Sequence, residues 1–323
     1  MNHVSRRIAL AVLGAAVAPA AAVAQPYPNR DIHIICSVPA GSGADVIVRF
    51  FAEKLRPMVG RTIIVENKVG ANSNIAVEYT VRSKPDGYTI YIHSASVVVS
   101  NYSLMKNPPV NPATDLQVAA STHLQPFMLV VAADSPYKTL AELTEAMLKK
   151  GDKASYSHSN ATGKVMGELY KAATGITAVD IPYRIAPDSL NDFASGRLDY
   201  GMMDPVTAIT QVKAGKLRML AISTPKRMES VPDLPTFAEG GVKGVEITTW
   251  FAAMVPAATP RPIVDQINTW MNQVVSQEDT KKFLNGFGSD PWITTPDEAQ
   301  AQFVKDQKAW EDYVKLAKIE PQG

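Results

Sequence analysis

The residues of this sequence that could do chemistry are small and polar, and they gather in short loops that follow apolar runs. The first loop comes after the β-branched run at 32–38 and opens a helical pattern of apolar residues. Such a loop brings unpaired backbone N–H groups and the positive end of a helix dipole to one point. It therefore predicts an anion-binding site built from backbone. Its candidate ligand-binding residues are Ala40, Gly41, Ser42, Gly43, Ala44 and Asp45.

Further loops of this kind follow later in the chain. The segment 156–164 carries more hydroxyl and amide groups before a helix than capping of that helix requires. Within it, Lys164 falls in the first helical turn, where the dipole disfavours a cation. Contact with a bound anion and simple exposure to solvent both explain this lysine. The candidates from these loops are Ser94, Ala95, Ser96, His158, Ser159, Asn160, Thr162, Gly163, Lys164, Met203 and Asp204.

Two more candidates lie on a long apolar run near residue 250. Thr249 and Trp250 belong to the segment 246–255, which reads as a strand. Hydroxyl and aromatic groups on such a strand suit the wall of a cleft, although Trp250 and Phe251 could also pack in a core. For Asp204, placed before Pro205, a role as helix N-cap is favoured over ligand contact.

Other chemistries find less support in the residue types. Gly41–Ser42–Gly43 is part of a dinucleotide-binding fingerprint, with Glu66 placed to bind a ribose, but Val46 stands where the third glycine belongs. A dinucleotide- or carboxylate-dependent exported enzyme is therefore kept as the alternative function.

No residue set for catalysis or metal binding stands out in the sequence. The five histidines lack metal-ligand spacing, the chain has one cysteine, and there is no Gly-x-Ser-x-Gly nucleophile elbow. We expect His33 and His93 to be structural and Cys36 to lie in the core. We therefore predict no catalytic residue, no cofactor and no metal site.

The elements that position these loops alternate along the chain. Apolar runs at 32–38, 63–65 and 88–93 alternate with helical patterns, and a second such series covers 154–222. Strands are also expected at 118–122, 127–132 and 246–255, followed only by helices at 262–275, 280–284 and 296–317. Thr139 and Glu142 form a capping-box pattern for a helix through Lys149. The alternation predicts two α/β lobes with a ligand cleft at the carboxyl ends of their strands.

Charge and length narrow the function classes. The chain has 323 residues, enough for two domains, with 32 basic and 31 acidic side chains and a net charge of +1. With basic and acidic side chains so nearly balanced, the chain has no excess of positive charge to bind nucleic acid or an acidic membrane surface.

The first 24 residues differ from the rest. Arg6 and Arg7 precede an apolar run at 8–17, and Ala22–Val23–Ala24 is a small-x-small cleavage site. This order is typical of a secretory signal peptide, and the run is too short to span a bilayer. We expect cleavage after Ala24 and a periplasmic mature protein, with the Sec route favoured over the twin-arginine route because Ala9 replaces the usual aromatic residue.

Several motifs occur together in one order along the mature chain. They are Tyr27–Pro28, Pro39–Asp45, Val65–Asn74, Pro85–Thr89, Gly167–Leu169, Ile181–Tyr183, Lys213–Arg218 and Trp250–Phe251. In these motifs the chain resembles the Bug family, the extracytoplasmic substrate-binding components of tripartite tricarboxylate transporters. The resemblance covers nearly all of residues 26–323.

This resemblance implies a two-lobed periplasmic-binding-protein fold of the Venus flytrap type (type II), closing on a small carboxylate. It implies that residues 25–126 and 253–323 form lobe 1 and residues 127–252 form lobe 2. The expected ligand is an aliphatic di- or tricarboxylate or an aromatic carboxylate, the expected partners are the transmembrane components of a transporter, and the protein is expected to be a monomer.

The sequence also departs from the family pattern. Ala44 replaces the usual Thr, Met203–Asp204 stands where Asp-Asn is common, and the 156–166 loop is shorter and carries Lys164. Apolar residues near strand ends would suit a larger apolar or aromatic carboxylate. They are Val97, Val98, Val99, Met202 and Met203.

Overall fold

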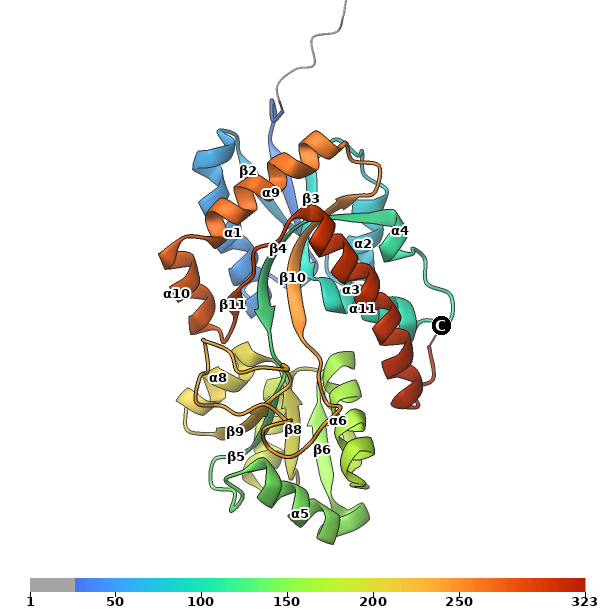
Figure 1. Cartoon of the computed structure of the whole chain (residues 1–323), viewed down its shortest axis with the longest axis vertical. Helices are drawn as coiled ribbons and strands as arrows, with labels where there is room; N and C mark the ends of the chain where they lie inside the picture. The colour runs from blue at the N-terminus through green and yellow to red at the C-terminus, as the bar shows by residue number, and fades with distance from the viewer. Residues whose placement is uncertain (1–26, 323) are drawn as a thin grey trace, which may run out of the picture.

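The computed structural model describes residues 27–322, which form two stacked α/β lobes, each built on one mixed sheet (Figure 1). The predicted two-lobed α/β fold is confirmed. The predicted signal peptide, with its cleavage site at Ala24, lies outside the described residues. Within the described residues, no helix is both long enough and apolar enough to cross a membrane.

The sheet of the first lobe has the strand order β11-β4-β10-β3-β1-β2. β1 pairs in parallel with β2 and β3, while β10 runs antiparallel to β3 and β4. The short β11 adds antiparallel to β4. The strands are β1 Ile32–Cys36, β2 Ile63–Asn67, β3 Thr89–Ser94, β4 Leu116–Gln125, β10 Thr249–Pro256 and β11 Asp290–Pro291.

The sheet of the second lobe has the order β7-β6-β8-β5-β9. Its β6 pairs in parallel with β7 and β8, and β5 is antiparallel to β8 and β9. The strands are β5 Met128–Ala132, β6 Ser155–His158, β7 Val179–Pro182, β8 Tyr200–Met203 and β9 Leu217–Ile222.

Helices cover both sheets. In the first lobe these are α1 Gly43–Val59, η1 Ala71–Ser73, α2 Asn74–Val81, α3 Ala95–Leu104, α4 Pro112–Asp115, α9 Arg261–Val275, α10 Glu278–Gly286 and α11 Pro296–Leu316. In the second lobe they are α5 Leu140–Lys150, η2 Gly151–Lys153, α6 Ala161–Thr174, η3 Ala186–Ser189, α7 Leu190–Ala194 and α8 Pro205–Lys213. The predicted capping box of Thr139 and Glu142 is confirmed at the start of α5.

The chain passes between the lobes at the β4–β5 turn and again before β10. The proposed lobe boundary at 126/127 falls in that turn, and the one at 252/253 falls within β10, all of which pairs in the first sheet. α11 then packs on α3 and β4 and reaches α6 of the second lobe. The buried apolar core on this side is continuous from one lobe to the other, and Cys36 lies in the core of the first lobe, as expected.

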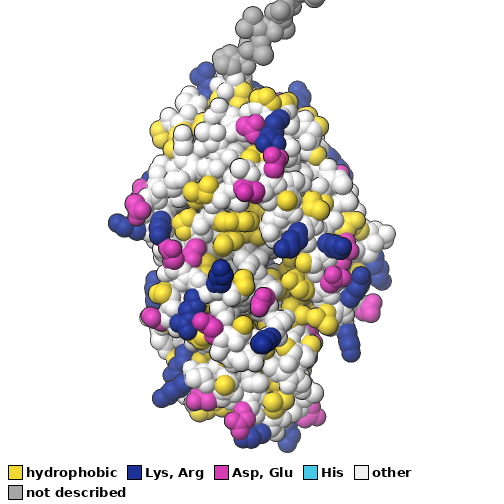
Figure 2. All heavy atoms as spheres, in the orientation of Figure 1, with side chains coloured by type: hydrophobic (Ala, Val, Ile, Leu, Met, Phe, Trp, Pro, Cys, Tyr) yellow, Lys and Arg dark blue, Asp and Glu magenta, His cyan; other side chains and the backbone are white. Residues whose placement is uncertain are grey.

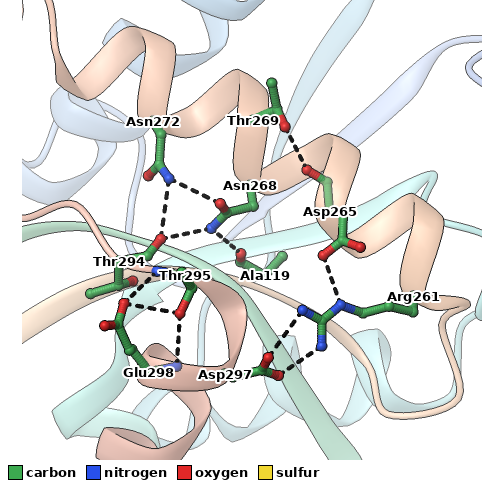
Figure 3. A network of polar contacts seen from close by, with 10 residues as sticks. All are labelled: Ala119, Arg261, Asp265, Asn268, Thr269, Asn272, Thr294, Thr295, Asp297 and Glu298. Atoms are coloured by element: carbon green, nitrogen blue, oxygen red, sulfur yellow. Dashed lines mark hydrogen bonds and ion pairs between the residues drawn. The ribbon is translucent and has the colours of Figure 1, made fainter.

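A polar network fixes the start of α11 against the first sheet (Figure 3). Asn268 Nδ2 on α9 donates to the carbonyl of Ala119 in β4 at 2.8 Å and to that of Thr294 at 3.0 Å. Thr295 and Glu298 form a second capping box at the first turn of α11. Asn268 thus ties β4 to the residue before the N-cap of α11, and the capping box satisfies backbone amides at the start of this helix.

Candidate functional site

A cavity of about 320 Å³ lies between the lobes, close to the lower end of the size range of small-molecule sites. β1 and β3 of one lobe and β6 and β8 of the other each lead into a helix, and the first residues of these four helices or their N-caps reach the cavity. The lining residues are Val38, Gly43, Ala44, Ile47, His93, Ser94, Val97, Gln125, Phe127, Asn160, Thr162, Asp204, Val206, Thr207, Thr249 and Phe251.

Three of these helices have their N-cap side chain in place. Ser94 Oγ accepts from the Val97 amide at 3.3 Å, Asn160 Oδ1 from Gly163 at 2.9 Å, and Asp204 Oδ1 from Thr207 at 2.9 Å. The capping role expected of Asp204 is therefore seen, and Asn160 is found to cap α6. Each cap satisfies one amide and leaves other first-turn amides free to meet a ligand.

α1 differs, because its N-cap residue Ser42 makes no side-chain capping bond. Ser42 Oγ is buried and has no hydrogen-bond partner in the part of the chain that the structure describes. Gly43 and Ala44 lie in this uncapped first turn and line the cavity. α1 therefore supplies the most open of the four anion-binding helix ends.

Asp45 shapes the first loop and is itself buried. Its Oδ2 accepts from the Gly41 amide at 2.8 Å and from Arg49 Nε at 2.9 Å, and its Oδ1 accepts from Asn67 Nδ2 at 2.7 Å. Burial alone would raise the pKa of this carboxyl, but these donors outweigh burial and leave its pKa below the usual value. Asp45 is thus a clamp that fixes the loop, with Gly41 at φ +82°.

One wall of the cavity is aromatic. Phe251 on β10 lies between two histidine rings, 5.5 Å from that of His93 and 4.5 Å from that of His123, measured between ring centroids. Burial lowers the pKa of His93 to about 4 and that of His123 to about 3, so both rings are neutral at pH 7. This wall therefore carries no charge at pH 7, and its Phe251 ring packs against both imidazole rings.

The structure distributes the predicted site residues over several places. Seven of them line the cavity: Gly43, Ala44, Ser94, Asn160, Thr162, Asp204 and Thr249. Ala40, Gly41, Ser42, Asp45, Ala95, Ser96, Ser159 and Gly163 belong to the same loops and first turns but are not among its lining residues. Met203 is in the core of the second lobe.

Trp250 points away from the cavity, because successive residues of a strand face opposite sides. Its Nε1 donates to Asp306 Oδ2 on α11 at 2.6 Å, and its ring meets Trp292 edge to face at 5.1 Å. Its neighbours Thr249 and Phe251 face the cavity instead. A strand pattern in the sequence predicts this alternation but not which of the two faces meets the ligand.

His158 and Lys164 lie at a second interlobe cavity of about 570 Å³. There Asp180 sits 2.7 Å from His158 Nε2 and 3.4 Å from Lys164 Nζ. Burial opposes the charge on Asp180, but the two neighbours outweigh it and hold the pKa of the carboxyl below its usual value. The cation in the first turn of α6 is thus balanced by an acid on β7.

The sequence analysis missed nine lining residues. The missed residues are Val38, Ile47, His93, Val97, Gln125, Phe127, Val206, Thr207 and Phe251. Of the five apolar residues expected to suit a larger ligand, Val97 lines the cavity, and the other four, Val98, Val99, Met202 and Met203, are core residues. His93 could have been found from its place at a strand end, directly before the N-cap Ser94.

The acid expected of a dinucleotide-binding enzyme is engaged elsewhere. Glu66, the candidate ribose acid, is 2.5 Å from His33 Nδ1 and 3.0 Å from Lys68 Nζ, and it is not among the lining residues. Within the described residues no group of three or more metal-ligating side chains is found. The cavity offers backbone amides, hydroxyls and an apolar wall, which suit binding of an anion with an apolar body.

Residues 47–317 match the model of the tripartite tricarboxylate transporter family receptor. The chain belongs to this receptor family. Because the family consists of transport receptors, the choice of a binding protein over an enzyme is confirmed, as is the resemblance to the Bug family. A relative, protein BugT of Bordetella pertussis, is 27% identical over 95% of this chain and 96% of its own length.

Two solved structures share the receptor's fold at higher identity. The periplasmic binding protein BugD is 29% identical with a TM-score of 0.78, covering 92% of this chain and 100% of its own. An R. palustris protein solved with adipate is 28% identical with a TM-score of 0.81, covering 91% of this chain and 99% of its own. Both are full-length matches, so the two-lobed arrangement is shared throughout.

Proposed function

We propose that the protein captures a small carboxylate in the periplasm and delivers it to the transmembrane components of a tripartite tricarboxylate-type transporter. The observation that carries this proposal is the meeting of four helix N-termini at one interlobe cavity, with α1 uncapped. An anion there gains from amides and dipoles of both lobes at once, so binding favours the closed state. The adipate in the R. palustris relative is of the same chemical class.

The ligand class is proposed from the cavity lining. Among the described residues that line it, none is Lys or Arg, and six are Val, Ile or Phe. Such a wall suits a carboxylate with an apolar or aromatic body as well as an aliphatic dicarboxylate.

A thermal-shift screen of the mature protein against aliphatic and aromatic carboxylates tests the proposal. At ligand concentrations about 100 times Kd, we expect a gain of about 2.7 kcal/mol in unfolding free energy. Each acid that binds should be recovered chemically unchanged after incubation with the protein. Calorimetry should find no binding of NAD. Turnover of the acid, stoichiometric NAD binding, or failure of every acid to bind would contradict the proposal.

The periplasmic location depends on the signal peptide, which we propose is removed after Ala24. N-terminal sequencing of the protein from the periplasm of a Gram-negative host should begin at Gln25. A sequence that still contains Arg6 and Arg7 would contradict export by cleavage.

A further inference from the structure

His93 is a buried polar side chain without a partner in the wall of the ligand cavity. The residue is 5% exposed, and among the described residues no group meets either ring nitrogen with hydrogen-bond geometry. Buried polar groups in proteins are nearly always bonded, and an unmet one is destabilising. Because His93 lines the cavity, a ligand can supply the missing partner.

The surroundings of His93 determine which ligand group fits. Its ring stacks on Tyr91 at 5.8 Å and lies 5.5 Å from Phe251, between ring centroids. The one acid in the lining, Asp204, is engaged in capping α8. Since burial keeps the ring neutral at pH 7, it presents one N–H donor and one acceptor.

We propose that the ligand is a carboxylate with an apolar, ring-sized body that carries a hydroxyl, and that His93 hydrogen-bonds this hydroxyl. The inference rests on the proposed function, which places the carboxylate at the helix N-termini. A hydroxyl both donates and accepts, so it can bond whichever ring nitrogen it meets, the N–H donor or the acceptor. A second carboxylate placed at His93 would face a neutral ring, with no Lys or Arg among the described lining residues to pair with it.

His123 supplies a matched control. It is buried even more deeply than His93, its ring stacks on Phe251, and its Nε2 has no partner among the described residues. Its Nδ1, however, is 2.9 Å from Thr122 Oγ1, and it is absent from the cavity lining. A purely structural effect of removing a buried imidazole should therefore appear in both histidines, and an effect on the ligand in His93 alone.

The test uses calorimetry to compare the affinities of benzoate and of 2-, 3- and 4-hydroxybenzoate. The proteins are the wild type, His93→Leu and His123→Leu. We expect one isomer to bind the wild type about fivefold to tenfold more tightly than benzoate, the size of a single neutral hydrogen bond. This gain should vanish in His93→Leu and persist in His123→Leu. Should His93→Leu fail to fold, imidazole ¹⁵N shifts of the wild type replace it, with His93 shifting on ligand addition and His123 not.

Three results would overturn the inference. The first is that His93→Leu keeps the affinity gained from the hydroxyl, or that the ¹⁵N shifts of His93 do not change when ligand is added. The second is that no hydroxybenzoate binds more tightly than benzoate. The third is that adipate binds more tightly than every aromatic acid. In each case carboxylates still bind, so the proposed function stands. Failure of all acids to bind the wild type would instead remove the proposed function itself.

Discussion

Gly43 faces Val206 across the cavity, and there is no room between them for a side chain. A Cβ at Gly43 would come within 2.9 Å of Val206 Cγ1, which belongs to the other lobe. We expect Gly43→Val to hold the lobes apart and to weaken carboxylate binding about tenfold or more, about 1.4 kcal/mol. The melting temperature of the unliganded protein should change little, because the clash arises only between lobes.

Two variants control this experiment by calorimetry. Gly286→Val is a matched change at a position where a Cβ would meet no atom within 4 Å, so affinity should be unchanged. Val206→Ala removes the clashing methyl group and should restore part of the affinity lost in Gly43→Val. Affinity of Gly43→Val within twofold of wild type would mean that the lobes do not close at this point.

Lys164 is engaged outside the candidate ligand cavity. Its Nζ is 3.4 Å from Asp180 Oδ2 in the second cavity, and its side chain is 39% exposed. We therefore expect Lys164→Gln to leave carboxylate affinity within about twofold and to change stability by less than about 1 kcal/mol, as for exposed ion pairs. A tenfold loss of affinity, measured by calorimetry at low and moderate salt, would place Lys164 in the binding site after all.

At the scale of elements, the helix caps separate stability from binding. Asn160 and Thr139 each accept a bond from a first-turn amide, at 2.9 and 3.2 Å, but only Asn160 lines the cavity. Removing either cap costs about 1 kcal/mol of stability. We expect Asn160→Ala and Thr139→Ala to lower the urea midpoint by similar amounts, while only Asn160→Ala weakens carboxylate binding.

Comparing these two variants also tests whether the start of α6 is part of the ligand-binding site. Equal affinities in Asn160→Ala and Thr139→Ala would show that the start of α6 does not contribute to the site. Loss of affinity in both would indicate that general destabilisation, and not the position of Asn160, is responsible.

For the whole molecule, the two buried histidines make stability depend on pH. Their folded pKa values, about 4 for His93 and about 3 for His123, lie below the unfolded value of 6.5. The unfolded chain therefore binds more protons below pH 6.5, and stability falls as pH drops towards 4. Each histidine contributes at most about 1.4 kcal/mol per pH unit.

Urea unfolding at pH 7.0, 5.5 and 4.5 measures this slope. His123→Leu should reduce the pH dependence of the unfolding free energy by up to one proton. Carboxyls with lowered pKa values, such as Asp45, contribute to this dependence only below about pH 4. An unchanged slope in His123→Leu would show that this ring is already protonated in the folded state.

The sequence by itself determined the local features of this receptor. Alternating apolar runs and helical patterns predicted two α/β lobes, and the loop at Gly41–Gly43 predicted a backbone anion site. The cap at Thr139 was predicted with its partner Glu142. These features depend on residues a few positions apart in the chain, so the sequence alone is enough to predict them.

Only the tertiary structure decided which residues meet in the cavity. Phe251 faces it and Trp250 does not, because long-range pairing of β10 with β3 and β4 orients the strand. Lys164 pairs with Asp180, on a neighbouring strand, and His93 takes its place beside Phe251. Such contacts depend on strand register and on how the lobes dock, which periodicity and turn residues leave open.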